Sequence, residues 1–376
     1  VLKSNKPHLP VVIYDVRSIK KQKAVLEKTF KNHASKFTTA YSYKTNPYLG
    51  SKMIELGCSF QVTSIGHLRE VKKLVGKNAS SKIIFNSRSL TKEELREVIQ
   101  SGAHLVINST HQYELAKEFV KKSNQRIEVG LRIDTQSSPR NTFFKTVNTG
   151  LGLTPIEIKR LTFRSNEVKI VGLHTHIASQ NTDLLSVKKG IEVLYKIFEQ
   201  NDFSFRYLNL GGGFPIQYDK PVPSITEFAT NINPTLKKIY KQNSTFEFVI
   251  EPGRFIVGNA GFLFVRVTDT MVHGLTNIAV VNSSIFSSVR DRILSKYDIK
   301  LPCITLGKQA KRLKKYLIVG SSPSSCDVFG DYRLPSIEIG DILVFTQAGA
   351  YCLSNDNFTG VEKPQEYIWS NGRLVK

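Results

Sequence analysis

Eight short β-rich runs alternate with stretches long enough to form a helix between residues 37 and 253. Parallel strands need long crossover connections, and helices usually supply them. The runs are Phe37–Thr45, Ser59–Ser64, Lys82–Ser87, His104–Ser109, Ile127–Asp134, Ile170–Ile177, Tyr207–Gly213 and Phe246–Gly253. Eight strand–helix repeats predict an α/β fold, a (β/α)8 TIM-type barrel, which we place at residues 35–260.

Two of the connecting segments carry clear helix signals. Thr91 begins the sequence Thr-Lys-Glu-Glu, in which the threonine and the second glutamate can cap the start of a helix. The segment Ser186–Gln200 places four apolar residues at helical spacing. Both signals support helices between the strands.

The pattern changes after residue 260 to closely spaced strands separated by turn residues, without helices of the barrel type. The candidate strands are Phe262–Thr268, Ile278–Val281, Lys315–Val319 and Asp341–Gln347. This spacing predicts a C-terminal all-β domain, and the opening strand Val11–Asp15 is assigned to the same domain. Its predicted extent is residues 1–34 and 261–376.

The chain is strongly basic, since 53 Lys and Arg against 31 Asp and Glu give a net charge of +22. Such a charge could attract nucleic acid, an acidic membrane or an anionic ligand. The densest cluster, within residues 308–315, is only local, and no nucleic-acid-binding motif accompanies it. We therefore expect a lysine-rich solvated surface and no nucleic-acid partner.

The longest apolar runs and the cysteines exclude two further classes. Runs such as Ile170–Leu173 are far shorter than the roughly 18 residues of a membrane span, and the N-terminus has no apolar signal core. The four cysteines form no CxxC pair, so neither a disulfide framework nor a zinc site is indicated. We expect a cytoplasmic protein with no membrane segment and no metal site.

Catalytic groups in such barrels come from the carboxyl ends of the strands, and a lysine ends the first one. Lys44 lies in the sequence Tyr-Lys-Thr-Asn-Pro. A lysine at the end of an apolar strand is expensive to bury as a cation, so its pKa tends to fall or it forms a Schiff base. The alternative is an ammonium group that simply reaches solvent.

Three further strand ends suggest a phosphorylated ligand. Gly211, Gly212 and Gly213 let backbone amides approach a phosphate, although a tight turn also explains them. Arg254 could add a bidentate phosphate contact, and Glu251 directs a carboxylate toward the same end of the barrel.

Together with Lys44 these groups describe a pocket for pyridoxal 5′-phosphate. In it Lys44 would bind the aldehyde, the glycines and Arg254 the phosphate, and Glu251 the pyridinium nitrogen. His176 could stack on the ring, or have a purely structural role, and Ser179 could contact the phosphate.

Six motifs in this order resemble the fold type III pyridoxal-phosphate decarboxylases, which include diaminopimelate and ornithine decarboxylases. They are Tyr43–Pro47, Leu173–Gln180, Gly211–Pro215, Glu251–Arg254, Cys326–Asp327 and Gly349–Tyr351. The resemblance implies an alanine-racemase-like barrel, a β domain that takes the N-terminal strand, and a homodimer with active sites at its interface. Asn209 stands where an aspartate often precedes the glycines in that family.

The resemblance also implies roles for residues of the β domain. Cys326 would be the general acid that protonates the substrate carbanion, Asp327 would contact the distal group of the substrate, and Tyr351 would lie near the phosphate. Without the family, Cys326 reads as a buried thiol and Tyr351 as a packed aromatic side chain.

The substrate signals conflict. Arg290 falls at the spacing of an arginine that engages a substrate carboxylate in diaminopimelate-type enzymes, although it could also be a helix-surface cation. Leu294 stands where those enzymes usually have a tyrosine, and Cys326-Asp327 departs from their usual Cys-Glu-Ser sequence. Decarboxylation of diaminopimelate, or of a similar diamino acid with a distal carboxylate, is the best prediction. The alternatives are an ornithine/polyamine- or siderophore-pathway decarboxylase, an amino-acid racemase, or a catalytically silent paralogue.

Overall fold

The computed structural model describes most of the chain and divides it into two compact units. The described residues are 8–31, 36–76, 80–140, 142, 144–145, 149–160, 168–200, 205–354 and 359–376. The barrel unit comprises residues 23–215 and 222–253, and the β unit comprises residues 1–22, 216–221 and 254–376. Each unit is described by itself.

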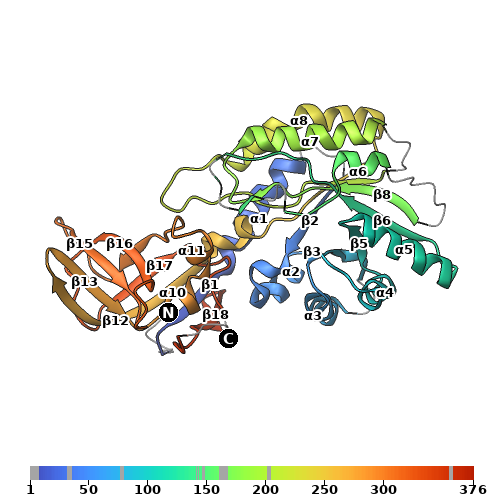
Figure 1. Cartoon of the computed structure of the whole chain (residues 1–376). Coiled ribbons are helices and arrows are strands. Elements are labelled where there is room, and N and C mark those ends of the chain that lie inside the picture. The colour runs from blue at the N-terminus through green and yellow to red at the C-terminus, as the bar shows by residue number, and fades with distance from the viewer. Residues whose placement is uncertain are drawn as a thin grey trace. The chain divides into compact units, whose positions relative to one another are not determined.

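The barrel unit contains a closed barrel of eight parallel strands (Figure 1). In order around the barrel they are β2 (Lys36–Ser42), β3 (Ser59–Val62), β4 (Ile83–Asn86), β5 (His104–Ile107), β6 (Ile127–Arg132), β8 (Val168–His174), β10 (Tyr207–Asn209) and β11 (Glu247–Ile250). Strand β11 pairs with β2 and closes the barrel. Each strand overlaps one of the eight predicted runs, so the predicted barrel is confirmed.

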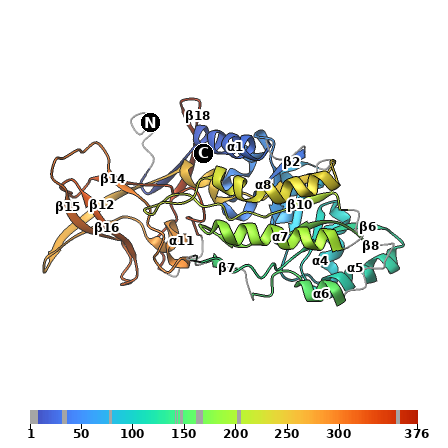
Figure 2. The same ribbon diagram turned by 90° about the horizontal axis from the view of Figure 1, so that it is seen from above.

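Helices connect the strands and cover the outside of the barrel (Figures 1 and 2). They are α1 (Val16–Lys31), α2 (Gly50–Glu55), α3 (Ile65–Val75), α4 (Lys92–Ser101), α5 (Thr110–Ser123), α6 (Pro155–Arg160), α7 (Leu184–Gln200) and α8 (Ile225–Gln242). Thr91 and Glu94 form the expected capping box at the start of α4. Helix α7 contains the predicted helical segment, and α7 and α8 lie side by side.

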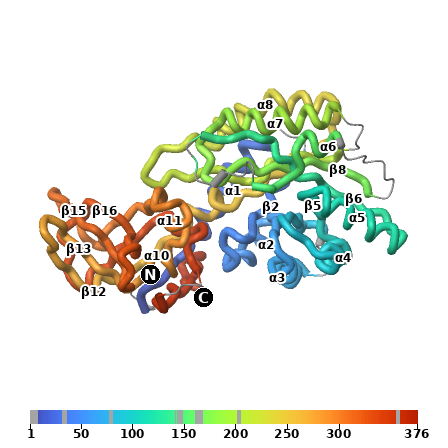
Figure 3. Tube along the Cα trace, in the orientation of Figure 1, coloured from blue at the N-terminus to red at the C-terminus, as the bar shows by residue number. Residues whose placement is uncertain are grey.

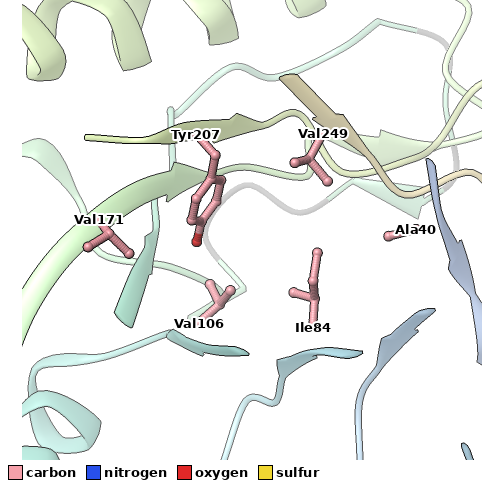
Figure 4. Close-up of a cluster of buried hydrophobic side chains, with 6 residues drawn as sticks. All are labelled: Ala40, Ile84, Val106, Val171, Tyr207 and Val249. Atoms are coloured by element: carbon pink, nitrogen blue, oxygen red, sulfur yellow. The ribbon is translucent and has the colours of Figure 1, made fainter. Parts of the chain in front are cut away.

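Apolar side chains from different strands converge inside the barrel (Figure 4). They are Ala40, Ile84, Val106, Val171, Tyr207 and Val249. The Tyr207 ring is accommodated because two neighbouring strands carry glycine. A Cβ at Gly172 would lie 2.1 Å from a ring carbon, and one at Gly130 would lie 1.9 Å from the phenol oxygen.

The β unit is built on a nine-stranded sheet. Its main path is β16 (Val328–Leu334), β15 (Lys314–Val319), β13 (Thr276–Val281), β12 (Gly261–His273), β1 (Val11–Asp15), β18 (Gln365–Ser370) and β19 (Arg373–Val375). Strand β17 (Ile342–Thr346) pairs with β12 and with β14 (Cys303–Thr305). The predicted β domain is thus confirmed.

The first strand is an interior strand of this sheet. Strand β1 pairs antiparallel with β12 on one side and parallel with β18 on the other. The Cα trace accordingly shows blue N-terminal chain beside red C-terminal chain (Figure 3). Val11 and Val12 in β1 are fully buried. The N-terminal strand therefore belongs to the β domain, as the sequence predicted.

No helix in the described part of the chain is long and apolar enough to cross a membrane. No group of three or more His, Cys, Asp or Glu side chains among the described residues could hold a metal ion.

Candidate active site

Buried polar side chains stand at the carboxyl ends of all eight barrel strands. They are Ser42, Gln61, Asn86, Asn108, Arg132, His174, Asn209 and Glu251, each at most 8% exposed. We call this set the polar ring. Burying polar side chains costs free energy, and the active sites of such barrels lie at the carboxyl ends of the strands. This end of the barrel is therefore the candidate site.

Glu251 is the anionic centre of the polar ring. Asn209 Nδ2 donates a hydrogen bond of 2.7 Å to Glu251 Oε1, and His174 Nε2 lies 3.3 Å from Oε2. Burial raises the pKa of Glu251, but these two neighbours favour the charged form, and the pKa lies below its usual value. Glu251 is therefore held as a carboxylate.

Asn209 explains one departure from the family pattern. Its Nδ2 donates to Glu251, while its Oδ1 accepts a 2.8 Å hydrogen bond from the Gly211 amide. An ionised aspartate at this position could accept from the glycine but could not donate to the glutamate. The asparagine thus links the carboxylate to the glycine loop without a second negative charge.

Lys44 follows β2 in a short 3-10 turn, Tyr43–Thr45, and its side chain is exposed. Its ammonium group forms no hydrogen bond or ion pair with any residue in the described ranges. Tyr43 beside it is buried, and its hydroxyl donates a 3.0 Å hydrogen bond to Glu70. The turn is thus anchored by its tyrosine, while the lysine amine stays available to a ligand.

His176 contacts the glycine loop and is held neutral. The Gly212 amide donates a 3.1 Å hydrogen bond to His176 Nδ1, which places the ring proton on Nε2. Burial lowers the pKa of His176 well below its usual value, and the positive charges of Arg132 and Lys44 lower it further. The imidazole therefore presents an uncharged ring at neutral pH.

The three glycines are required by close backbone packing. Gly211 and Gly213 have φ of 65° and 93°. A Cβ would lie 2.2 Å from the Glu251 carbonyl oxygen at Gly212 and 1.8 Å from the Ala178 carbonyl oxygen at Gly213. The loop therefore packs directly against the ends of neighbouring strands. Its first two amides bond to Asn209 and His176, which leaves only the third for a ligand.

Ser179 ends the two-residue strand β9 (Ala178–Ser179), which pairs with β7 (Phe144–Lys145). Its carbonyl oxygen accepts a 3.0 Å hydrogen bond from Thr142 Oγ1. Its hydroxyl makes no hydrogen bond within the described residues. This half-buried hydroxyl is available to a ligand.

Unsatisfied polar atoms show that the polar ring suits a polar ligand. Asn86 Nδ2, both side-chain polar atoms of Asn108, and His174 Nδ1 are buried without a partner. Arg132 donates to Asn86 Oδ1 at 2.9 Å, and burial lowers the pKa of the arginine to about 10, so it remains a cation. The residues present therefore fit a group that carries charges and hydrogen-bonding atoms.

Arg254 lies in the β unit within a buried cluster. Its Nη1 forms an ion pair with Asp291 and donates a 2.7 Å hydrogen bond to the Tyr218 hydroxyl. Its guanidinium lies 5.1 Å from the centre of the Tyr351 ring. Its Nε is buried without a hydrogen-bond partner among the described residues, so this donor remains for an anion.

Cys326 is the exposed member of the four cysteines. The Tyr297 hydroxyl donates a 3.0 Å hydrogen bond to the Cys326 carbonyl oxygen. Partial burial and the neighbouring Cys326 side chain raise the pKa of Tyr297 above its usual value. Burial raises the pKa of Cys58 and of Cys352 to about 12. Cys326 is thus the cysteine that solvent or a substrate reaches most easily.

Asp327 is 1% exposed and bonds to its own surroundings. Its Oδ1 accepts a 2.8 Å hydrogen bond from the Ile285 amide. Its Oδ2 accepts from the Ser322 amide and, at 2.6 Å, from the Ser322 hydroxyl. The carboxylate therefore ties together the loops that flank Cys326.

Arg290 is exposed at the start of α11 (Arg290–Leu294), and its guanidinium has no ion-pair partner within the described part of the chain. Its backbone amide bonds to the Cys352 carbonyl oxygen at 2.9 Å. Leu294 at the other end of α11 is 51% exposed. An exposed arginine suits both of its predicted roles, carboxylate binding and surface charge.

Several residues of the polar ring and of the cluster around Arg254 were not predicted from the sequence. Arg132, His174 and Asn86 end barrel strands, so the rule that selected Lys44 could have found them. Asp291 and Tyr218 carried no local signal, because they reach Arg254 across 37 and 36 residues of sequence.

Comparison with known proteins identifies the family. Residues 16–258 match the family model described as "Pyridoxal-dependent decarboxylase, pyridoxal binding domain". The chain belongs to this family. It is an amino-acid decarboxylase whose cofactor is pyridoxal 5′-phosphate, and the resemblance inferred from the motifs is confirmed.

Individual relatives of this decarboxylase match along most of the chain. The diaminopimelate decarboxylase of Methanocaldococcus jannaschii is 28% identical over 89% of this chain and 79% of its own length. The diaminopimelate decarboxylase of Aquifex aeolicus is 25% identical over 97% of this chain and 87% of its own length. A crystal structure of the M. jannaschii enzyme has a TM-score of 0.87 at 26% identity, covering 99% of this chain and 89% of that one.

Proposed function

We propose that this decarboxylase acts on a diamino acid with a distal carboxylate, of which diaminopimelate is the best representative. The observation that carries the proposal is the similarity to diaminopimelate decarboxylases over nearly the full chain. The guanidinium of Arg290 supports it, since it is exposed and has no ion-pair partner among the described residues, and arginine recognises carboxylates through two parallel hydrogen bonds.

Pyridoxal 5′-phosphate, when bound, supplies an aldehyde and an electron-accepting ring. The Lys44 amine, which has no hydrogen-bond or ion-pair partner within the described ranges, is the group we assign to the aldehyde. Glu251, held as a carboxylate, would hold a proton on the ring nitrogen. The neutral His176 imidazole contributes an uncharged surface for the ring face.

The phosphate would be held by donors that have no hydrogen-bond partner among the residues that the structure describes. These are the Gly213 amide, the Ser179 hydroxyl and Arg254 Nε. Gly211 and Gly212 support the loop through their contacts with neighbouring strands. Tyr351 orders the Arg254 guanidinium through its ring.

Cys326 is the proposed proton donor to the α-carbon of the substrate after carbon dioxide has left. Its exposure supports this role, since the proton must reach a bound substrate. We assign Asp327 a positioning role, because its carboxylate fixes the loop that carries Cys326. Direct contact between Asp327 and the distal group of the substrate stays a prediction.

We further propose that the protein is a cytoplasmic homodimer with active sites at the subunit interface. The family resemblance supports this arrangement. It predicts that Lys44→Ala and Cys326→Ala chains, each defective alone, form active mixed dimers. Random mixing should restore about a quarter of wild-type product formation, because half the dimers carry one intact site. No gain on mixing would contradict the shared site.

A second substrate class is favoured by one observation. Leu294 presents an apolar, 51% exposed side chain where diaminopimelate-type enzymes carry a tyrosine. A diamino acid with a different distal group, from polyamine or siderophore metabolism, would match this change. Arg290 would then be a surface cation.

Carbon dioxide release by the cofactor-loaded protein tests the proposal. The substrates are meso-diaminopimelate, L-ornithine, L-lysine, L-arginine and carboxylated polyamines. We expect release from diaminopimelate, loss of turnover and of cofactor absorbance in Lys44→Ala, and retained absorbance in Arg290→Ala. Turnover retained by Lys44→Ala would refute the assignment of the lysine.

The role of Arg290 is tested by comparing two variants. Arg290→Ala should lower kcat/KM for diaminopimelate by about ten- to hundredfold, because a charged hydrogen bond contributes about 1.5–3 kcal/mol. Arg312→Ala, at an exposed arginine of the same unit, is the matched control. Equal activity of both variants, or release only from a substrate without a distal carboxylate, would favour the second class.

A further inference from the structure

A cavity of about 840 Å³ opens at the amino-terminal ends of the barrel strands, opposite the polar ring. Its lining includes the first residues of six strands, namely Lys36, Ser59, His104, Ile127, Tyr207 and Glu247. Small-molecule sites typically have volumes of about 300–1,000 Å³. This cavity is therefore large enough for a metabolite, and it shares no residue with the catalytic end.

Part of the cavity lining, which we call the floor, is apolar and uncharged. It comprises the Tyr207 ring with Ile84, Val171 and Val249, which belong to the buried cluster drawn in Figure 4. Tyr207 Oη lies 2.6 Å from His104 Nε2. Burial, followed by the charge of Arg206, lowers the pKa of His104 to about 4. At neutral pH the imidazole is thus neutral, so the floor carries no charge.

The rim of the cavity is positively charged. Four cations line it, but Lys36 lies 3.5 Å from Glu247 and Arg206 pairs with Glu128. The other two, Lys82 and Arg126, have no ion-pair partner among the residues that the structure describes. Counted over the described residues, the rim therefore has two uncompensated positive charges.

Strand order places these two cations on either side of His104. Lys82 immediately precedes β4 and Arg126 immediately precedes β6, while His104 begins the strand between them. Neighbouring strands are about 4.8 Å apart, so the backbones that carry the two cations are about 10 Å apart. Both side chains are long enough to reach one anionic group in that interval.

We propose that this mouth of the barrel binds a small organic anion with an apolar body. The anionic group, a carboxylate or a phosphate, lies between Lys82 and Arg126, and the apolar body packs on the floor around Tyr207. The charged rim and the neutral floor together select such a ligand, because a purely apolar molecule gains nothing from the rim. This site is independent of the proposed function.

The test is titration of the cofactor-loaded protein with 8-anilinonaphthalene-1-sulfonate, which joins an aromatic body to one anionic group. Calorimetry should show one saturable site per chain. The variant Lys82→Glu/Arg126→Glu should bind the probe at least tenfold more weakly. Lys73→Glu/Lys121→Glu, which makes the same charge change at exposed lysines on α3 and α5, should bind like the wild type.

Three further measurements make the test decisive. Carbon dioxide release should be unchanged in both double variants, which shows that the barrel is intact. If charge reversal prevents folding, Lys82→Gln/Arg126→Gln replaces it, and its affinity should still fall. Benzoate and phenyl phosphate should compete with the probe, and the stronger competitor identifies the anionic group. No saturable binding, equal weakening in both double variants, or no competition by either anion would overturn the proposal.

Discussion

His104 makes the stability of the barrel unit depend on pH in a predictable direction. In the folded chain burial lowers the pKa of His104 to about 4, against 6.5 for an ordinary histidine. Between these values the unfolded chain binds a proton that the folded chain does not. Stability is therefore fully present above about pH 6.5 and is lost as the pH falls toward 4.

The size of the effect follows from the two pKa values. Lowering the pH from 7 to 4.5 should destabilise the folded barrel by about 2.5 kcal/mol through this histidine alone. His104→Gln removes the titrating group and keeps a hydrogen-bonding side chain beside Tyr207. The variant should lose about 2.5 kcal/mol less than the wild type over the same pH range.

Guanidinium chloride unfolding, followed by far-ultraviolet circular dichroism at pH 7 and 4.5, measures this difference. Cofactor concentration is held constant, because ligand binding also shifts the midpoint. His111→Gln, at an exposed histidine on α5, is the control and should lose as much stability as the wild type. The reasoning fails if His104→Gln and the wild type lose equal stability between the two pH values.

Three other substitutions test the packing and charge arguments. Asp291→Ala should destabilise the β unit by about 3–5 kcal/mol, because it leaves the buried Arg254 cation without its anion, and thermal unfolding would report this. Gly172→Ala should cost about 1–3 kcal/mol, since its Cβ meets a fixed aromatic ring, whereas Gly66→Ala in α3 meets only an atom at 3.9 Å and should be tolerated. Glu251→Gln should slow decarboxylation about 10²- to 10³-fold. It should also abolish the loss of stability that the wild type shows as the pH falls through the lowered pKa of this carboxyl group. An unchanged rate and an unchanged dependence of stability on pH would contradict this account.

The barrel was predictable because its signals are local. Each strand is an apolar run of fixed period, and each connection has room for a helix, so the order of elements can be counted along the chain. The same count places Lys44, His176 and Glu251 at the carboxyl ends of strands, and all three lie in the barrel unit at that end.

Features that depend on distant contacts were not predictable. The pairing of Arg254 with Asp291 joins residues far apart in sequence, and no periodicity marks it. Asp327 stands next to Cys326 in the motif, yet it is buried because the Ile285 amide lies against it. Short strands such as β14, with three residues, are too brief to show a period. Only tertiary packing decides these cases.

The position of β1 between β12 and β18 has a consequence for synthesis on the ribosome. The barrel sequence, residues 23–215 and 222–253, emerges before either partner of β1 has been made. The apolar first strand must therefore wait unpaired through most of translation, and its sheet is completed only when residues 365–370 emerge. Until then Val11 and Val12 form an exposed strand edge that can pair with other chains. We expect chaperone capture of nascent chains to fall sharply once β18 has been translated.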